Sequence, residues 1–188
     1  MAKLVFGMNQ SLDGYVDHER FGPMPPGLFR HYIEHVRGVR GMLYGRRLYE
    51  LMQYWDEDRP DWSAEQREYA HAWRSHPKWV ASRTLTSVGP NATLVGDDLE
   101  KVAQRLRDDG DGEIDVAGPE LAHHLGQRGL IDEYRLTMLP VVLGYGTPFF
   151  AGSLPPLRLV GSDRIGDAVI QLRYVPDEDF GSTVIRLP

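Results

Sequence analysis

Residues 113–121, Glu-Ile-Asp-Val-Ala-Gly-Pro-Glu-Leu, decide the fold of this chain. The run from 113 to 117 predicts a buried strand, which Gly118 and Pro119 end, and residues 120–127 have the composition of a helix. A strand that leads through glycine into a helix leaves backbone N–H groups free to bind an anion. The stretch therefore predicts a βα unit with an anion-binding turn.

A second junction of this kind lies earlier in the chain. A brief strand at 42–44 is followed by Gly45, which opens a helix that ends at Met52. In a parallel sheet both junctions lie at the same carboxyl edge, where α/β folds bind ligands. One junction alone is explained by a glycine that simply ends a strand. Two junctions, one of them followed by Arg46 and Arg47, favour phosphate binding, although neither has the G-x-G-x-x-G or P-loop pattern.

The remaining sequence continues the alternation of strand and helix and then becomes rich in strands. Helices are predicted at 28–37, at 63–75 with Ser63 and Gln66 as a capping box, and from Asp97 or Asp98 to 108. Further strands are predicted at 3–9, 78–82, 92–95, 131–143 with an interruption at Pro140, 157–162, 168–175 and 182–187. After the turn that ends at Gly14, a long loop is predicted up to about Pro26, because its Gly- and Pro-rich residues 22–27 cannot form a regular helix or strand. This loop is either a lid or a linker, and we favour a lid. The pattern predicts a single three-layer α/β domain over residues 1–188, with a mixed, mainly parallel sheet that ends in antiparallel strands.

The composition excludes several classes of function. The 188 residues are 41% hydrophobic and carry a formal net charge of −6, so we expect a globular protein with no general affinity for nucleic acid. No apolar run is long enough for a membrane span, and we expect no membrane partner. The absence of cysteine rules out disulfides and thiolate metal sites. The start of the chain has no signal-peptide pattern, and we expect a cytoplasmic location.

A third polar segment follows the strand predicted at 78–82. Ser82, Arg83 and Thr84 place two hydroxyls and a guanidinium there. Taken singly, Arg46, Arg47 and Arg83 are best explained as solvated surface charges. Together they fit the 2′-phosphate of an adenosine ribose, and they predict that the chain binds NADPH rather than NADH.

Five motifs occur in the order and spacing of a known family. They are Ser11-Leu-Asp-Gly14, Gly45-Arg-Arg47, Ser82-Arg-Thr-Leu85, Val116-Ala-Gly-Pro-Glu-Leu121 and Leu143-Gly-Tyr-Gly-Thr-Pro-Phe-Phe150. With these motifs, nearly the whole chain resembles the dihydrofolate-reductase-like family. It is most similar to the reductase half of the bacterial riboflavin-biosynthesis deaminase-reductase, the RibD C-terminal domain. The resemblance implies an NADPH-dependent reductase that transfers hydride to a pterin-, flavin-precursor- or pyrimidine-like heterocycle.

The resemblance also implies roles for individual residues. The residues implied to hold the phosphates and the adenosine ribose of NADPH are Gly45, Arg46, Arg47, Ser82, Arg83 and Thr84. Those implied to receive the pyrophosphate at a helix N-terminus are Gly118, Pro119, Glu120 and Leu121. The nicotinamide is implied to lie beside Asp13 and Gly14. The substrate side is implied to be lined by Gly144, Gly146, Thr147 and Phe149.

The chain departs from dihydrofolate reductase at the substrate. The carboxylate that binds the pterin ring in those enzymes falls near Phe29 here, and the helix at 28–37 contains only Glu34 as an acid. Reduction of dihydrofolate is therefore not expected. A zinc deaminase half would require cysteines that the chain lacks. We therefore expect a stand-alone reductase.

Asp13 is the candidate catalytic residue, because a carboxylate beside the nicotinamide can orient or protonate a substrate nitrogen. Its alternative role is to close the Asp-Gly turn. Trp55 and Tyr54 are candidates for the wall of the substrate pocket, with a role as core or interface anchors as the alternative. His31 and His35 have helical spacing without a third ligand nearby, so no metal site is expected.

Two functions of other classes remain open at this point. One is a non-catalytic nucleotide-binding protein that keeps the cofactor edge, and the other is a carrier of a flavin or nucleotide-derived ligand. We also expect a homodimer, because relatives that resemble the riboflavin reductase pair through their sheets. The strand-rich residues 157–187 offer alternating apolar side chains at a sheet edge.

Overall fold

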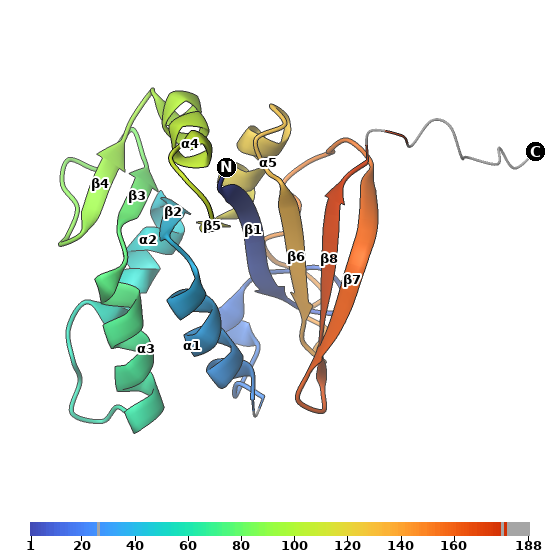
Figure 1. Ribbon diagram of the computed structural model, residues 1–188. Coiled ribbons are helices and arrows are strands. Elements are labelled where there is room, and N and C mark those ends of the chain that lie inside the picture. Colours follow the sequence, from blue (N-terminus) through green and yellow to red (C-terminus); the bar gives the residue numbers. More distant parts are fainter. Residues whose placement is uncertain (26, 178, 180–188) are drawn as a thin grey trace, which may run out of the picture.

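The sheet predicted from the strand–glycine–helix pattern is present in the computed structural model, which describes residues 1–25, 27–177 and 179. The strands are β1 (Lys3–Gln10), β2 (Gly41–Gly45), β3 (Lys78–Ala81), β4 (Ala92–Val95), β5 (Glu113–Ala117), β6 (Glu133–Met138), β7 (Leu157–Ile165) and β8 (Val169–Pro176). In this part of the chain they form one sheet in the order β4-β3-β2-β5-β1-β6-β8-β7 (Figure 1). The first six strands of this order pair in parallel, whereas β8 pairs antiparallel with β6 and β7. This confirms the predicted mixed sheet.

Helices cover both faces of the sheet, which gives the expected three layers. They are α1 (Leu28–Gly38), α2 (Arg46–Met52), α3 (Ala64–Ser75), α4 (Leu99–Asp108) and α5 (Pro119–Gly126), with 3₁₀ turns at His18–Arg20 and Gln53–Trp55. Leu106 of α4 and Leu125 of α5 pack with Phe6 on one face. Val36 of α1 and Trp73 of α3 pack on the opposite face (Figure 1). Each βα crossover thus buries one apolar helix stripe against the sheet.

Two details of the sequence prediction are corrected. The strand expected over 131–143 contains only residues 133–138, because Pro140 lacks an N–H and the chain leaves the sheet after Met138. Asp98 occupies the N-cap position of α4 but makes no cap bond, since its carboxylate accepts a hydrogen bond from Lys101 Nζ at 2.8 Å. The capping box of Ser63 and Gln66 is confirmed. The strand predicted at 182–187 lies outside the described residues.

The two faces of the central strands differ in polarity, and this difference positions the site. Alternate residues of a strand point to opposite faces. Leu4, Phe6, Ile114 and Val116 therefore enter the apolar core under α4 and α5. The opposite face of β1, β5 and β6, toward α1, carries Gly7, Asn9, Asp115, Arg135 and Thr137. Glycine and polar side chains cannot fill this layer with apolar contacts, so a cavity remains between α1 and the sheet.

Among the described residues, none of the helices has both the length and the apolar character needed to cross a membrane.

Candidate functional site

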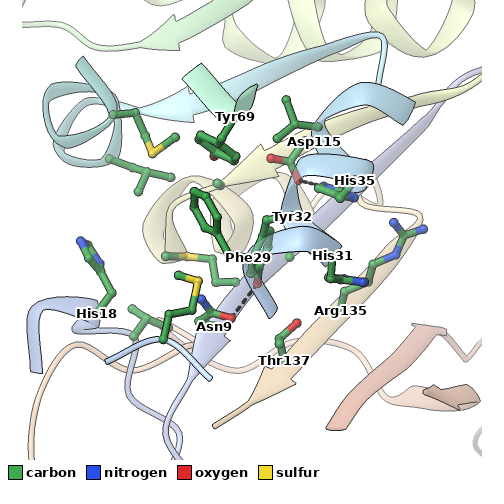
Figure 2. A pocket seen from close by; sticks show the side chains of 18 of the residues that line it. Asn9, His18, Phe29, His31, Tyr32, His35, Tyr69, Asp115, Arg135 and Thr137 are labelled. Carbon is green, nitrogen blue, oxygen red and sulfur yellow. Dashed lines mark hydrogen bonds and ion pairs between the residues drawn. The ribbon is translucent and has the colours of Figure 1, made fainter. Parts of the chain in front are cut away.

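A cavity of about 260 Å³ lies between α1 and the sheet (Figure 2). Its floor consists of residues from β1, β2, β5, β6 and β8, and its walls come from α1, α2, α3 and the 3₁₀ turn at Gln53–Trp55. His18 and Met24, from the loop before α1, also line it. That loop was predicted to be a lid, and these two side chains place it at the cavity.

Hydrogen bonds fix the polar floor of the cavity. The Tyr32 hydroxyl donates to Asn9 Oδ1 at 2.6 Å, which ties α1 to β1 (Figure 2). Gln171 Nε2 donates to Thr137 Oγ1 at 3.0 Å, which ties β8 to β6. Because each amide uses one end in these bonds, the orientation of its other end is fixed as well.

Aromatic rings form the wall that faces this floor. The ring centroids of Phe29 and Tyr69 are 5.5 Å apart, and those of Trp55 and Tyr69 are 4.8 Å apart. Phe29 and Trp55 were predicted on the substrate side, and both line the cavity. Tyr54 does not line the cavity. Its hydroxyl instead accepts from Trp62 Nε1 at 2.8 Å. Such a wall suits a flat ring ligand.

Charged groups gather around Arg135 and His35, which both line the cavity. Arg135 donates to both Glu113 oxygens at 2.9 and 2.7 Å and to Glu133 at 2.7 Å. His35 Nε2 of α1 lies 3.2 Å from Asp115 Oδ1 of β5 (Figure 2). Burial opposes a proton on His35, but the hydrogen bond and the charge of Asp115 outweigh it, so the pKa of His35 is raised.

This charged group was not predicted from the sequence. His35 was considered only as a metal ligand, and Asp115 was assigned only to a buried strand. The available signal was the acid itself, because a carboxylate inside a buried strand needs a partner or a function.

The two glycine junctions meet at the carboxyl edge of the sheet, as predicted. β2 pairs with β5, and a Cβ atom built on Gly118 would lie 3.5 Å from the backbone nitrogen of Gly45. Gly118 has φ +124°, a backbone conformation that residues other than glycine rarely adopt. Pro119 begins α5, and no side chain caps that N-terminus. Its first N–H groups are therefore available to an anion. Leu121 is buried behind the junction, while Glu120 is exposed.

The predicted ribose-binding residues lie at the rim of the same edge. Gly45 is paired with Ala81, the last residue of β3, which places Ser82 next to it. Arg83 is 82% exposed and donates to Asp97 at 2.9 Å. Arg46 lies 3.5 Å from Glu50, and Arg47 and Thr84 are exposed. These side chains are free enough to turn toward a phosphate.

Comparison with known proteins identifies this arrangement. The sequence model of the RibD C-terminal domain matches residues 2–171. The chain belongs to this family.

The solved structures agree with the family. A protein from Shewanella sp. PV-4, provisionally named as a riboflavin biosynthesis protein, superposes with a TM-score of 0.69 at 26% identity, covering 95% of this chain and 100% of that one. Dihydrofolate reductase from Enterococcus faecalis has the same fold, with a TM-score of 0.63 at 16% identity over 94% of this chain and 97% of its own. The uncharacterised protein YyaP of Bacillus subtilis strain 168 is 26% identical over 182 residues, which cover 92% of this chain and 94% of YyaP.

In this RibD C-terminal domain Asp13 has a different environment from the one expected of a catalytic acid. Its carboxylate accepts the N–H of Leu143 at 3.1 Å and of Gly144 at 2.7 Å. A hydrogen bond from Ser11 and these backbone N–H groups lower the pKa of Asp13 to about 2. Asp13 is not among the residues that line the cavity. Asp13 therefore connects its own loop to the loop at residues 143–144. Gly14 beside it has φ +87°.

The stretch 143–150 also lies outside the cavity of this RibD C-terminal domain. Thr147 donates its N–H and its hydroxyl to Asp17 at 2.6 and 3.1 Å. Gly144 and Gly146 turn the chain with positive φ. Phe149 is 1% exposed and packs on Phe6 with ring centroids 4.5 Å apart, because its ring points into the apolar core under α5. Gly144, Gly146, Thr147 and Phe149, which were expected on the substrate side, do not line this cavity.

Proposed function

We propose that this domain is an NADPH-dependent reductase that transfers hydride to a pterin-, flavin-precursor- or pyrimidine-like heterocycle bound under α1. One observation carries the proposal. Tyr44 and Ala117 immediately precede Gly45 and Gly118, and both also line the cavity. The edge with the anion-binding geometry and the aromatic cavity therefore share a wall, as hydride transfer between two bound molecules requires.

The residues at the edge fit a dinucleotide. Gly45 and Gly118 have no side chain, which leaves room at each position that a Cβ atom would fill. The uncapped N-terminus of α5 offers N–H donors for a pyrophosphate. Ser82, Arg83 and Thr84 at the rim would hold the ribose with its 2′-phosphate. When bound, NADPH supplies the hydride, while the protein orients the substrate ring and excludes water.

The cavity fits a planar heterocycle with polar edges. Phe29, Trp55 and Tyr69 offer ring faces for stacking. Asn9 and Thr137 offer fixed polar groups at the floor. The experiment is to add NADPH and a panel of pterins, lumazines and aminopyrimidines, and to follow NADPH oxidation by absorbance. Turnover of at least one ring supports the proposal. Binding of NADPH without oxidation by any ring would favour a non-catalytic nucleotide- or flavin-binding protein instead.

Dihydrofolate should be reduced at a negligible rate in this assay. The helix position expected to carry a pterin-binding carboxylate holds Phe29, whose ring packs on Tyr69. Glu34, the acid of that helix, is exposed and does not line the cavity. Efficient turnover of dihydrofolate at neutral pH would contradict this expectation and would mean that another acid binds the ring.

NADPH should bind more tightly than NADH. Arg46, Arg47 and Arg83 lie at the rim where the 2′-phosphate would sit, and a hydrogen bond to a charged group contributes about 1.5–3 kcal/mol. The loss of this contact should lower the affinity at least about tenfold. Titrating both cofactors against the intrinsic tryptophan fluorescence measures the difference. Equal dissociation constants would reject the assignment of these arginines.

We also propose that two copies of the chain associate through the β7–β8 end of the sheet. Among the described residues β7 is one of the two edge strands, and Leu159 and Val160 on it are 52% and 43% exposed. Edge strands with apolar side chains readily pair with another chain. Sedimentation at micromolar concentration should show a dimer, and a monomer alone would reject the pairing.

A further inference from the structure

The pair of His35 and Asp115 is an unexpected feature of the cavity. The side chains are 18% and 15% exposed, and they reach each other from α1 and β5 across 80 positions of sequence. Both line the cavity. His35 uses Nε2 toward Asp115, and Nδ1 makes no hydrogen bond within the described part of the chain. The fully buried side-chain nitrogens without a hydrogen-bond partner in this part of the chain are Arg107 Nε and His123 Nδ1, and Nδ1 of His35 is not one of them.

Four other side chains that line the cavity, those of His31, Tyr32, Tyr69 and Arg135, are poorer proton donors near neutral pH. Burial lowers the pKa of His31, which has no carboxylate partner, so this ring is neutral. Burial raises the pKa of Tyr32 and of Tyr69 far above the neutral range, so both hydroxyls hold their protons tightly. Arg135 is held by two glutamates and stays charged. His35 combines a raised pKa with an exchangeable proton.

The position of the pair suits a substrate that starts at the cofactor edge. Asp115 and Ala117 are on the same face of β5, two residues apart, which corresponds to about 7 Å along a strand. Ala117 adjoins Gly118, where the cofactor is proposed to approach. A planar ring that lies along β5 from Ala117 therefore reaches His35.

We propose that His35 is the proton donor of the reduction and that Asp115 is the residue that positions it. The inference rests on the proposed function. As the carbon of a substrate C=N bond accepts hydride from the reduced cofactor, the π electron pair moves to the nitrogen. The nitrogen forms its new N–H bond with the proton of the His35 imidazolium. His35 is left neutral and regains a proton from water.

The surroundings of His35 decide how its protonation depends on pH. The groups that act on it are His31 and Tyr32 of α1, Glu113 and Asp115 of β5, and Arg135 of β6. Behind them, Glu133 binds Arg135, and Tyr69 of α3 lies near Asp115. Asp115 provides the hydrogen bond that favours the charged ring, and Arg135 opposes it. The rate should therefore fall as pH rises through the pKa of His35. Removal of the Asp115 charge should move that fall to lower pH.

Three variants test the proposal. His35→Gln can still donate to Asp115 but cannot transfer a proton. Asp115→Asn keeps the imidazole and removes the charge. His71→Gln, at an exposed histidine of α3 outside the cavity, is the matched control. Each is tested for folding by circular dichroism, for NADPH binding, and for NADPH oxidation with the best ring of the panel across the pH range.

Nuclear magnetic resonance provides a readout that needs no substrate. The C–H signal of the His35 ring is assigned by its loss in His35→Gln and then titrated. Its pKa should lie above the ordinary value of about 6.5 in the wild type and below it in Asp115→Asn. A His35 that titrates at the same pH in both proteins would overturn the role of Asp115.

The kinetic result decides the role of His35. General acid catalysis typically contributes about 10²–10⁴-fold, so His35→Gln should lose at least about 100-fold in kcat with little change in KM. His71→Gln should keep the wild-type rate. A His35→Gln protein with the wild-type rate and pH profile would overturn this inference alone. If none of the heterocycles in the panel causes the wild-type protein to oxidise NADPH, the proposed function is overturned as well.

Discussion

Gly118→Asp is expected to abolish NADPH binding. A Cβ atom at this position would lie 3.5 Å from the nitrogen of Gly45, in the gap between the two junctions. The carboxylate would occupy the space in front of the N-terminus of α5, where the pyrophosphate should approach the backbone. Steric exclusion and repulsion between like charges both oppose binding. The loss should exceed about 100-fold, which corresponds to about 2.7 kcal/mol.

The control for this variant is Gly118→Asn. Asparagine has nearly the same shape and the same strain at φ +124°, which costs about 1–3 kcal/mol of stability in either variant. The difference in NADPH affinity between the two variants therefore reports the charge alone. Circular dichroism and thermal melting establish that both are folded. A folded Gly118→Asp protein that binds NADPH with unchanged affinity would place the cofactor elsewhere, and the assignment of the reductase site would fail.

Arg135→Met is expected to be the most destabilising change at the floor of the site. The guanidinium binds Glu113 and Glu133, and the Glu133 side chain is only 8% exposed. Removing the cation leaves two adjacent carboxylates at the sheet without a partner. Breaking a buried ion pair in this way costs about 3–5 kcal/mol. Urea unfolding at neutral pH measures the loss.

The pH dependence of this loss has a definite sign. The hydrogen bonds of Arg135 lower the pKa of Glu113 below its unfolded value of about 4.3. The pair therefore stabilises the wild type above that pH, and the contribution disappears as pH falls through the lowered pKa. The difference in free energy of unfolding between wild type and Arg135→Met should be largest near pH 7 and should shrink below about pH 4.

Two controls accompany Arg135→Met. Arg128 pairs with Glu100 at the surface, so Arg128→Met should cost at most about 1 kcal/mol. Adding Glu113→Gln and Glu133→Gln to Arg135→Met should restore much of the stability, because no unpaired charge remains. A loss in Arg135→Met no larger than in Arg128→Met would show that the network is not effectively buried.

The sequence by itself determined the architecture and the edge of the sheet at which the two glycine junctions meet. The breaks at Gly45 and Gly118, the capping box at Ser63 and the alternation of strand and helix are local signals. Each depends on backbone conformation within a few residues, so neighbouring sequence suffices to predict it. The meeting of the two glycine junctions also followed, because parallel strands share one carboxyl edge.

Only the tertiary structure decided where the cavity under α1 lies and which polar groups reach it. His35 and Asp115 are 80 residues apart, and whether they meet depends on the height of α1 above the sheet and on the strand face that each residue occupies. The sequence had suggested a ligand site at Asp13 and Phe149. The same long-range geometry instead places Asp13 in a contact between two loops and Phe149 in the core. Short-range patterns specify elements, but side chains from distant segments converge only once packing has fixed register and distance.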